Sequence, residues 1–162
     1  MSAAPQLAKD PSRPCVLFVD DDAGNRQAFQ ATFRRTFDVL VARDLREAWE
    51  QLAGNHVHVV IADQRMPYTP GSRLLSLIKD RYPTIRRMLI TGYADIEAII
   101  EAVNMAGVSR YIAKPWNVDE LSLAMHQAFD EVKAEEEQKA YTERLVTANR
   151  QLEFALRQRL IS

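Results

Sequence analysis

The stretch Cys15-Val16-Leu17-Phe18-Val19-Asp20-Asp21-Asp22 is the most informative part of this chain. Its first five residues are all apolar, and β-branched valines are among them, which is typical of a short strand buried on both faces. Three aspartates then end the apolar run. Strands of this kind occur mainly in parallel sheets covered by helices, so the stretch predicts an α/β protein with carboxylates at one strand end.

Similar apolar runs recur along the chain and predict four more strands. They lie at residues 39–41, 57–62, 88–90 and 108–113. Helical spacing separates them: Phe29, Phe33 and Phe37 recur every four residues and share one helix face. Five strands that alternate with helices predict a doubly wound, five-stranded parallel sheet with helices on both faces.

Glycines are placed to end two of the predicted helices. Gly54 is expected to cap the second helix, and Gly107 to close the fourth. The fourth helix carries an apolar stripe formed by Ile96, Ile99, Ile100 and Val103.

Polar side chains follow three more of the predicted strands. Asp63 follows the third strand, Thr91 the fourth and Lys114 the fifth. The carboxyl ends of parallel strands share one edge of the sheet, so these groups are expected to join Asp20 and Asp21 there. Clustered carboxylates favour a bound cation such as Mg²⁺, whereas the hydroxyl and the ammonium favour an anion. A phosphoryl group on a carboxylate satisfies both halves of this site.

Four motifs in this order resemble the receiver domain of two-component response regulators. They are Val19-Asp20-Asp21-Asp22, Ile61-Ala62-Asp63-Gln64-Arg65-Met66-Pro67, Leu89-Ile90-Thr91-Gly92-Tyr93 and Tyr111-Ile112-Ala113-Lys114-Pro115-Trp116. The resemblance covers about residues 14–129 and implies a flavodoxin-like fold for a receiver domain at 14–130.

The resemblance implies a role for each matching residue. Asp63 would be the phosphoacceptor, taking a phosphoryl group from a sensor histidine kinase or a phosphotransfer protein. Asp21 would ligate Mg²⁺ directly and Asp20 mainly through water, with Asp63 and the main-chain carbonyl of Arg65 as further ligands. Lys114 would pair with one phosphoryl oxygen, and the Thr91 hydroxyl would bond another.

Two further implied features concern the response to phosphorylation. Tyr111 would be a switch aromatic that turns inward when Thr91 moves. The peptide bond before Pro115 would be cis, a form that X–Pro bonds tolerate. The chain would then be a signalling domain and not an enzyme, with only self-phosphorylation from a phosphodonor and autodephosphorylation.

One loop and three histidines depart from the motifs or stand outside them. After Pro67 the chain reads Tyr68-Thr69-Pro70-Gly71, which keeps a glycine but stiffens the approach to it with a proline. The histidines show no metal-ligand spacing and are expected to be ordinary loop, strand and helix residues; they are His56, His58 and His126.

The C-terminal part predicts one long helix, because residues 116–162 contain neither Gly nor Pro. Within it, Tyr141, Leu145, Ala148, Leu152 and Ala155 recur at alternating spacings of four and three, the pattern of a coiled-coil seam. We therefore expect a flexible leader at 1–13 and a helical extension at 131–162. We call this extension the stalk and expect it to pair two copies of the chain into a homodimer.

Composition narrows the functional classes. The chain has 21 Lys and Arg and 22 Asp and Glu, so it has no excess of basic residues. Direct binding to nucleic acid is therefore not expected. Cys15 is the only cysteine, which excludes an intramolecular disulfide framework. No apolar run is long enough to span a membrane, and the leader lacks the apolar core of a secretion signal, so a cytoplasmic location is expected.

Two other functions stay open. A receiver-like interaction module that is not regulated by phosphorylation would be expected to lack Asp63 or the acid pair. A haloacid-dehalogenase-type phosphatase would use Asp20 and Asp22 as nucleophile and acid/base. The phosphatase needs another acidic pair at a later strand end, but only Asp119 and Glu120 follow Lys114, at the start of a helix.

Overall fold

The computed structural model describes residues 10–92 and 95–161. In these ranges the strands are β1 (Cys15–Val19), β2 (Asp38–Ala42), β3 (Val59–Asp63), β4 (Arg86–Thr91) and β5 (Arg110–Ala113). The helices are α1 (Ala23–Phe33), α2 (Leu45–Gly54), α3 (Gly71–Arg81), α4 (Ile96–Met105) and α5 (Val118–Ile161). Most of the predicted leader and Tyr93, which ends the third motif, lie outside the described residues.

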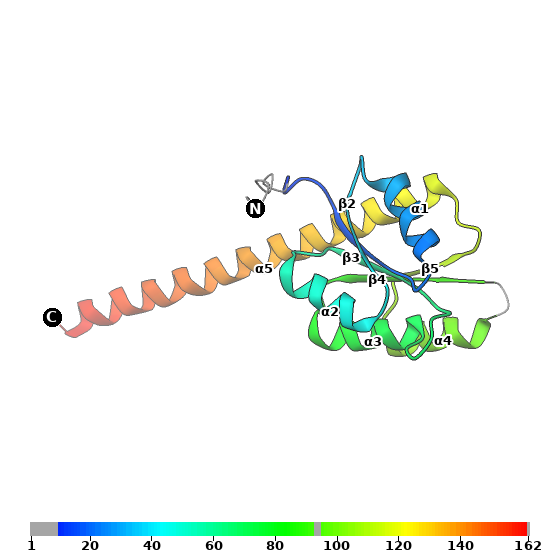
Figure 1. The fold of residues 1–162 in the computed structure, drawn as a ribbon. Coiled ribbons are helices and arrows are strands. Elements are labelled where there is room, and N and C mark those ends of the chain that lie inside the picture. Colours follow the sequence, from blue (N-terminus) through cyan, green and yellow to red (C-terminus); the bar gives the residue numbers. More distant parts are fainter. Residues whose placement is uncertain (1–9, 93–94, 162) are drawn as a thin grey trace, which may run out of the picture.

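The strands form one parallel sheet in the order β2-β1-β3-β4-β5, with helices on both faces. Helices α2, α3 and α4 cover one face, and α1 and the first part of α5 cover the other (Figure 1). Leu17 and Val19 pack in the first of these cores, while Val16 and Phe18 pack in the second. Strand β1 is apolar throughout because both of its faces are covered. The predicted doubly wound α/β fold is confirmed.

Several element boundaries differ from the predicted ones. Strand β3 begins at Val59 and not at residue 57, because the His58 main-chain N–H and side chain are both used in contacts with Cys15. Strand β5 begins at Arg110 and not at residue 108, since the Val108 N–H still bonds to the Ala102 carbonyl of α4. Strand β4 extends beyond the predicted 88–90 at both ends.

Two helix ends also differ from the predicted ones. Helix α1 ends at Phe33, but the Phe37 N–H donates to the Phe33 carbonyl and keeps Phe37 buried beside it. Gly54 is the last residue of α2, and Asn55 follows it as the C-cap. Gly107 follows α4 with a φ of 56°, a conformation that favours glycine.

Two residues of the predicted apolar stripe on α4 are exposed to solvent. Ile100 and Val103 are 55% and 52% exposed, whereas Ala102 and Ala106 are buried and belong to the core. The stripe correctly predicted a helix, but the small residues Ala102 and Ala106 are among those of this segment that are buried in the core.

Helix α5 is continuous over 44 residues, as predicted. At ~1.5 Å per residue it is about 66 Å long. Its first part is buried against the sheet through Leu121, Ala124, Met125, Ala128 and Val132. Every residue from 137 to 161 is exposed, and Figure 1 shows this part extending away from the sheet and the helices that cover it. Among the described helices, none combines the length and the apolar character needed to cross a membrane.

Candidate functional site

The predicted polar residues meet at the carboxyl edge of the sheet. Asp20 follows β1, Asp63 ends β3, Thr91 ends β4 and Lys114 follows β5. The first three are buried, with exposed fractions of 2%, 4% and 3%. The Lys114 ammonium forms an ion pair with Oδ1 of Asp63. The expected clustering of carboxylates and ammonium is therefore found, and Thr91 lies at the end of the neighbouring strand β4.

The Asp20 carboxylate is held through both of its oxygens. Oδ1 accepts the Asp22 main-chain N–H at 2.9 Å, and Oδ2 accepts the Asn25 side-chain amide at 3.0 Å. Burial raises the pKa of Asp20, and the two donated hydrogen bonds act in the opposite direction. The Arg26 guanidinium donates to the Asp20 main-chain carbonyl at 2.8 Å, which ties the end of β1 to α1.

Three carboxylates in this site are close enough to share one cation. Ligand oxygens of Asp20, Asp21 and Asp63 lie within 4.8 Å of one another. Asp21 is exposed, so the cluster opens to solvent on its side. An open set of hard oxygen donors fits Mg²⁺, which keeps several waters and takes few protein ligands. The residues of this structure thus suit the predicted metal.

The loop after Asp63 is shaped by hydrogen bonds that return to the site. The Arg65 N–H donates to Oδ2 of Asp63 at 3.1 Å, so both carboxylate oxygens of Asp63 have partners. The Gln64 side chain accepts the Ser72 N–H at 2.8 Å, and its main-chain carbonyl accepts the Gly71 N–H.

Pro70, at which this loop departs from the receiver motif, has a structural explanation. Pro70 is the N-cap residue of α3, where a residue without an N–H is readily accommodated. Tyr68 takes up the turn with a φ of 70°, and its side chain is fully exposed.

The two predicted switch residues differ in exposure. The Thr91 hydroxyl lies close to the Gly92 carbonyl, with 3.3 Å between the two oxygens. Tyr111 on β5 is 53% exposed, so its ring occupies an outward position. The bond between Lys114 and Pro115 is cis, as predicted.

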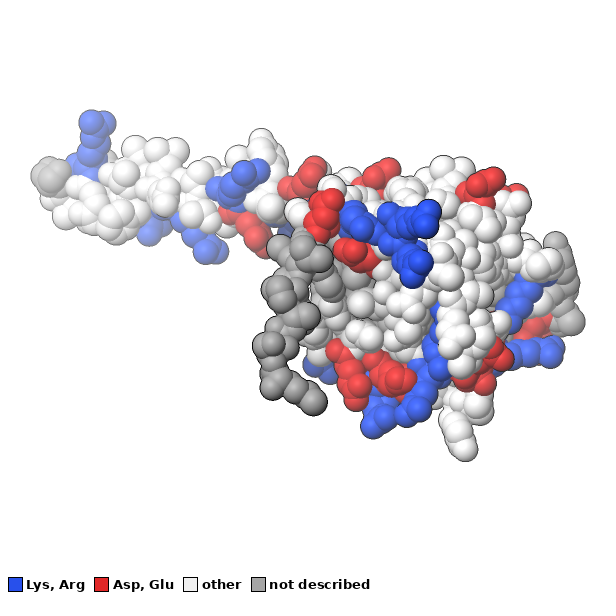
Figure 2. Space-filling model, turned by 45° about the horizontal axis from the view of Figure 1, so that its top comes forward, with Lys and Arg blue, Asp and Glu red and all other residues white. Residues whose placement is uncertain are grey.

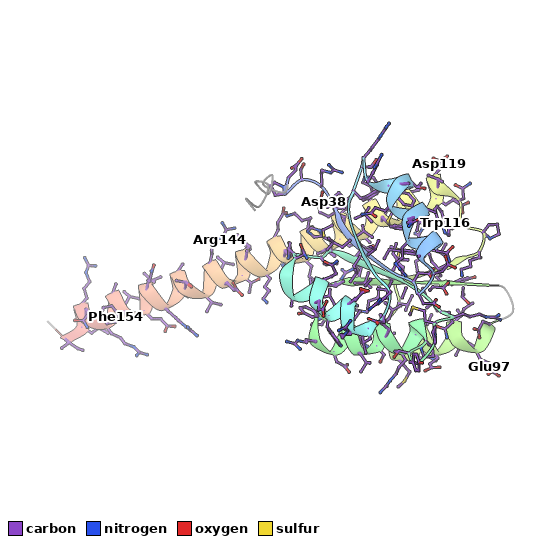
Figure 3. All side chains as sticks on the ribbon, in the orientation of Figure 1. Asp38, Glu97, Trp116, Asp119, Arg144 and Phe154 are labelled. Atoms are coloured by element: carbon purple, nitrogen blue, oxygen red, sulfur yellow. The ribbon has the colours of Figure 1, made fainter. Side chains whose placement is uncertain are left out.

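A hollow of about 440 Å³ lies beside the carboxyl edge of the sheet. It is lined by Phe18, Asp20, Asn25, Ala28, Ile90, Lys114, Pro115 and Trp116. Trp116 packs against Phe33 with 5.6 Å between ring centroids, and Figure 3 shows it beside α1. The sequence interpretation missed Asn25; the available signal was its place one helical turn after the acid pair.

A second cluster of titratable groups was also missed. Ligand atoms of His56, His58 and Glu136 lie within 4.8 Å of one another, contrary to the expectation of unrelated histidines. Nε2 of His56 lies 2.9 Å from the Glu136 carboxylate. However, Nδ1 of His58 accepts the Cys15 N–H, so the neutral ring carries its proton on Nε2 and offers no free lone pair there. The cluster therefore joins α5 to the segment before β3, and His58 lacks the free lone pair that a third metal ligand would need.

The same end of α5 makes a second set of ion pairs. The Arg86 guanidinium bonds Glu131 at 3.1 Å and Glu135 at 2.9 Å. Glu135 and Glu136 therefore each have a partner outside α5, Arg86 for Glu135 and His56 for Glu136.

Residues 16–126 match the family model described as "Response regulator receiver domain". The chain belongs to this family. The receiver motifs at the strand ends thus occur in the fold and at the sheet edge that the resemblance implied.

The chain is similar to a matched part of two much longer curated proteins. The hydrogenase transcriptional regulatory protein HoxA of Cupriavidus necator is 40% identical over 115 residues, which are 71% of this chain and 24% of that protein. HoxA of Bradyrhizobium diazoefficiens is 36% identical over 113 residues, which are 70% of this chain and 23% of that protein. The chain therefore spans about a quarter of the length of these relatives.

A solved receiver domain has the same architecture. The signal receiver domain of an HD domain-containing protein from Pseudomonas fluorescens Pf-5 is 34% identical, with a TM-score of 0.74. The likeness covers 82% of this chain and 98% of that one.

Proposed function

We propose that this receiver accepts a phosphoryl group on Asp63 and passes the signal to its helical stalk. The observation that carries the proposal is the Asp63 carboxylate paired with Lys114 and lying beside the Asp20 and Asp21 carboxylates at one strand edge. Its partner is a sensor histidine kinase or a phosphotransfer protein, in keeping with the family. The domain acts on no external substrate in this proposal.

In the proposed reaction, an Asp63 oxygen forms a bond to phosphorus while the P–N bond to the donor histidine breaks. The departing imidazole keeps that electron pair. Lys114 stays beside Asp63 and balances the negative charge that the phosphoryl group brings. Mg²⁺ held by Asp20, Asp21, Asp63 and the Arg65 carbonyl supplies further positive charge when it is bound.

The proposed switch rests on the difference in exposure between Thr91, which is buried, and Tyr111, which is exposed. The Thr91 hydroxyl lies close to the Gly92 carbonyl in this structure and turns to donate to a phosphoryl oxygen. That movement makes room for Tyr111, which leaves its exposed position and turns inward. Tyr111 lies on β5, the strand that leads through the Lys114–Pro115 bond into α5.

We further propose that the stalk pairs with a second copy of the chain. Tyr141 follows the buried Val132 by nine residues, and Leu152 follows it by twenty. At ~3.6 residues per turn these are about two and a half and five and a half turns, so the seam lies opposite the face that packs on the sheet. Two stalks can therefore pair in parallel with both receiver bodies outside the seam.

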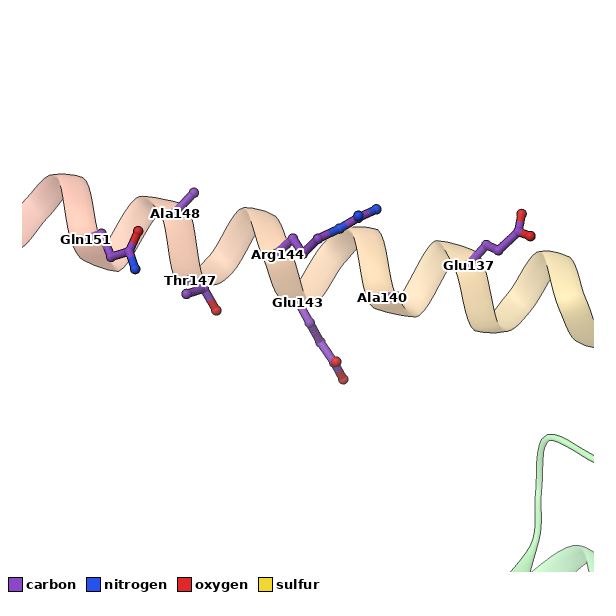
Figure 4. Close-up of a pocket in the computed structure, with 7 residues that line it drawn as sticks. All are labelled: Glu137, Ala140, Glu143, Arg144, Thr147, Ala148 and Gln151. Atoms are coloured by element: carbon purple, nitrogen blue, oxygen red, sulfur yellow. The ribbon is translucent and has the colours of Figure 1, made fainter. Parts of the chain in front are cut away.

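The exposed surface of the stalk supports this pairing. Tyr141, Leu145 and Leu152 are 55%, 48% and 60% exposed. Ala140, Thr147 and Ala148 leave a shallow hollow on the helix, bordered by longer side chains such as Glu143 and Arg144 (Figure 4). The face of the molecule in Figure 2 carries basic side chains along the stalk and acidic ones nearer the sheet, and Glu143 and Glu153 also lie on the stalk. A 44-residue helix with its outer half exposed gains stability from such a partner.

The relatives support a role in transcriptional control. Both HoxA proteins are named as transcriptional regulatory proteins and are much longer than the matched region. We infer that the far end of the stalk delivers the signal to an output of that kind.

The phosphatase alternative is disfavoured by the place of Asp22. Its side chain accepts the Asn25 N–H at 2.8 Å as the N-cap of α1, so it is engaged in helix capping. Phosphorylation with acetyl phosphate and Mg²⁺, followed by intact mass, tests the proposed function directly.

A further inference from the structure

Asn25 connects α1 to the acid pair through two different groups. Its main-chain N–H donates to Oδ1 of Asp22 at 2.8 Å, which fixes the residue in the first turn of α1. Its side-chain Nδ2 then donates to Oδ2 of Asp20 at 3.0 Å. The same side chain lines the hollow that contains Lys114 and Trp116. Asn25 thus reaches the phosphoacceptor edge from the helix and not from a strand end.

We propose that Asn25 is a positioning residue for the magnesium site, acting through Asp20. This inference rests on the proposed function, because it assumes that Asp20, Asp21 and Asp63 hold Mg²⁺. Asn25 is not expected to touch the metal or the phosphoryl group itself.

The hydrogen bonds of Asp20 explain why a second donor matters. The Asp22 N–H holds only Oδ1, and a single donor leaves the carboxylate free to rotate about its Cβ–Cγ bond. The Asn25 amide holds the other oxygen and so fixes the plane of the carboxylate. Both donors are uncharged, so the full negative charge of Asp20 remains available to a cation. Partners that orient ligand groups in this way commonly change metal affinity by roughly 10–100-fold when they are lost.

Lys114 does not orient the Asp20 carboxylate, because its ion pair is with Asp63. Lys114 pairs with Asp63, and no ion pair between Lys114 and Asp20 is found among the described residues. The Arg26 guanidinium bonds the Asp20 main-chain carbonyl and not its carboxylate. The side-chain donor that reaches the Asp20 carboxylate in the described structure is therefore the Asn25 amide.

The decisive variants are Asn25→Ala and Asn25→Leu, with Gln27→Ala as the matched control. Gln27 is exposed on the same helix. Alanine and leucine both have higher helix propensity than asparagine, so neither substitution weakens α1 through its intrinsic helix preference. Leucine also keeps much of the side-chain volume, so a common effect of both variants reports the lost amide.

The measurement is a Mg²⁺ titration followed by Trp116 fluorescence in a Trp49→Phe background. Both Asn25 variants are expected to bind Mg²⁺ about tenfold more weakly than the parent, and Gln27→Ala to bind it equally well. The rate of phosphorylation by acetyl phosphate should fall at limiting Mg²⁺ and recover at saturating Mg²⁺. Unchanged or tighter Mg²⁺ binding in both Asn25 variants would overturn the inference.

Failure of the proposed function gives a different result. In that case the parent protein gains no phosphoryl group at any Mg²⁺ concentration, or Asp63→Asn still gains one. If the parent is phosphorylated on Asp63 but the Asn25 variants have the parental Mg²⁺ affinity, only the role of Asn25 is wrong.

Discussion

The α-carbon of Gly71 lies directly against the main-chain carbonyl of Asp63. A β-carbon at position 71 would fall far inside contact distance of that carbonyl oxygen, and it would also meet the Leu89 side chain at 3.0 Å. Gly71 begins α3, so the close approach brings the start of the helix against the end of β3. The glycine is required by space at the site and not by a positive φ.

Replacement of Gly71 by alanine is expected to destabilise the protein by about 2 kcal/mol, since the Asp63 backbone and α3 must separate. Phosphorylation by acetyl phosphate should slow as well, because Asp63 moves with its backbone. Gly54→Ala is the matched control: nothing lies within 4 Å of the added β-carbon, and alanine favours the end of α2. Urea unfolding of both variants measures the difference, and equal stabilities would contradict the packing argument.

His58 gives the fold a predictable response to pH. It is 5% exposed, and burial lowers the pKa of His58 from 6.5 to about 4. Between these values the unfolded chain binds a proton on His58 and the folded chain does not. Stability therefore falls as the pH decreases from about 6.5 towards 4, by up to about 3 kcal/mol from this residue.

The variant His58→Asn separates this contribution from that of the carboxylates. An asparagine oxygen can still accept the Cys15 N–H but does not titrate in this range. The free energy of unfolding of the variant should fall less between pH 7 and pH 4.5 than that of the parent. A parallel pH dependence in the two proteins would show that His58 is not kept neutral by the fold.

The stalk should control the oligomeric state. Burying Leu145 and Leu152 against a second copy contributes about 1.5–3 kcal/mol for each side chain. The double variant Leu145→Asp with Leu152→Asp is therefore expected to be monomeric, as is a chain that ends after Val132. Sedimentation equilibrium of the full chain should give the mass of a dimer.

A second pair of substitutions, on the other side of the stalk, tests whether the dimer contact is the seam itself or the helix as a whole. Val146 and Phe154 are 44% and 65% exposed but lie on the opposite side of the stalk from the seam; Figure 3 shows Phe154 projecting from the helix. Val146→Asp with Phe154→Asp should leave the dimer intact. The same mass for both double variants would mean that the seam is not the dimer contact.

The sequence predicted the parts of this protein that depend on local pattern. An apolar run followed by a carboxylate indicates a buried strand and its end, and parallel topology then brings Asp20 and Asp63 to one edge. The long helix was also predictable, because its residues lack both Gly and Pro. The exposure of Ile100 could not be predicted, because the spacing of apolar residues alone does not say which face of a helix meets the sheet.

Contacts between distant segments were beyond this kind of prediction. His56 and His58 stand two residues apart, but Glu136 reaches them only because α5 continues along the base of the receiver body. Glu135 and Glu136 stand in a run of three glutamates, which by itself gives no sign that two of the carboxylates contact Arg86 and His56. Asn25 carried little signal because a polar residue near a helix start is common.

The central claim is tested most directly by the intact mass of the protein after incubation with acetyl phosphate and Mg²⁺. We expect the parent chain to gain one phosphoryl group and Asp63→Asn to gain none. Asp22→Asn is the matched control, because asparagine also serves as a helix N-cap, and it should still be phosphorylated. A phosphoryl group on Asp63→Asn, or none on the parent chain, would contradict the assignment of Asp63 as the phosphoacceptor.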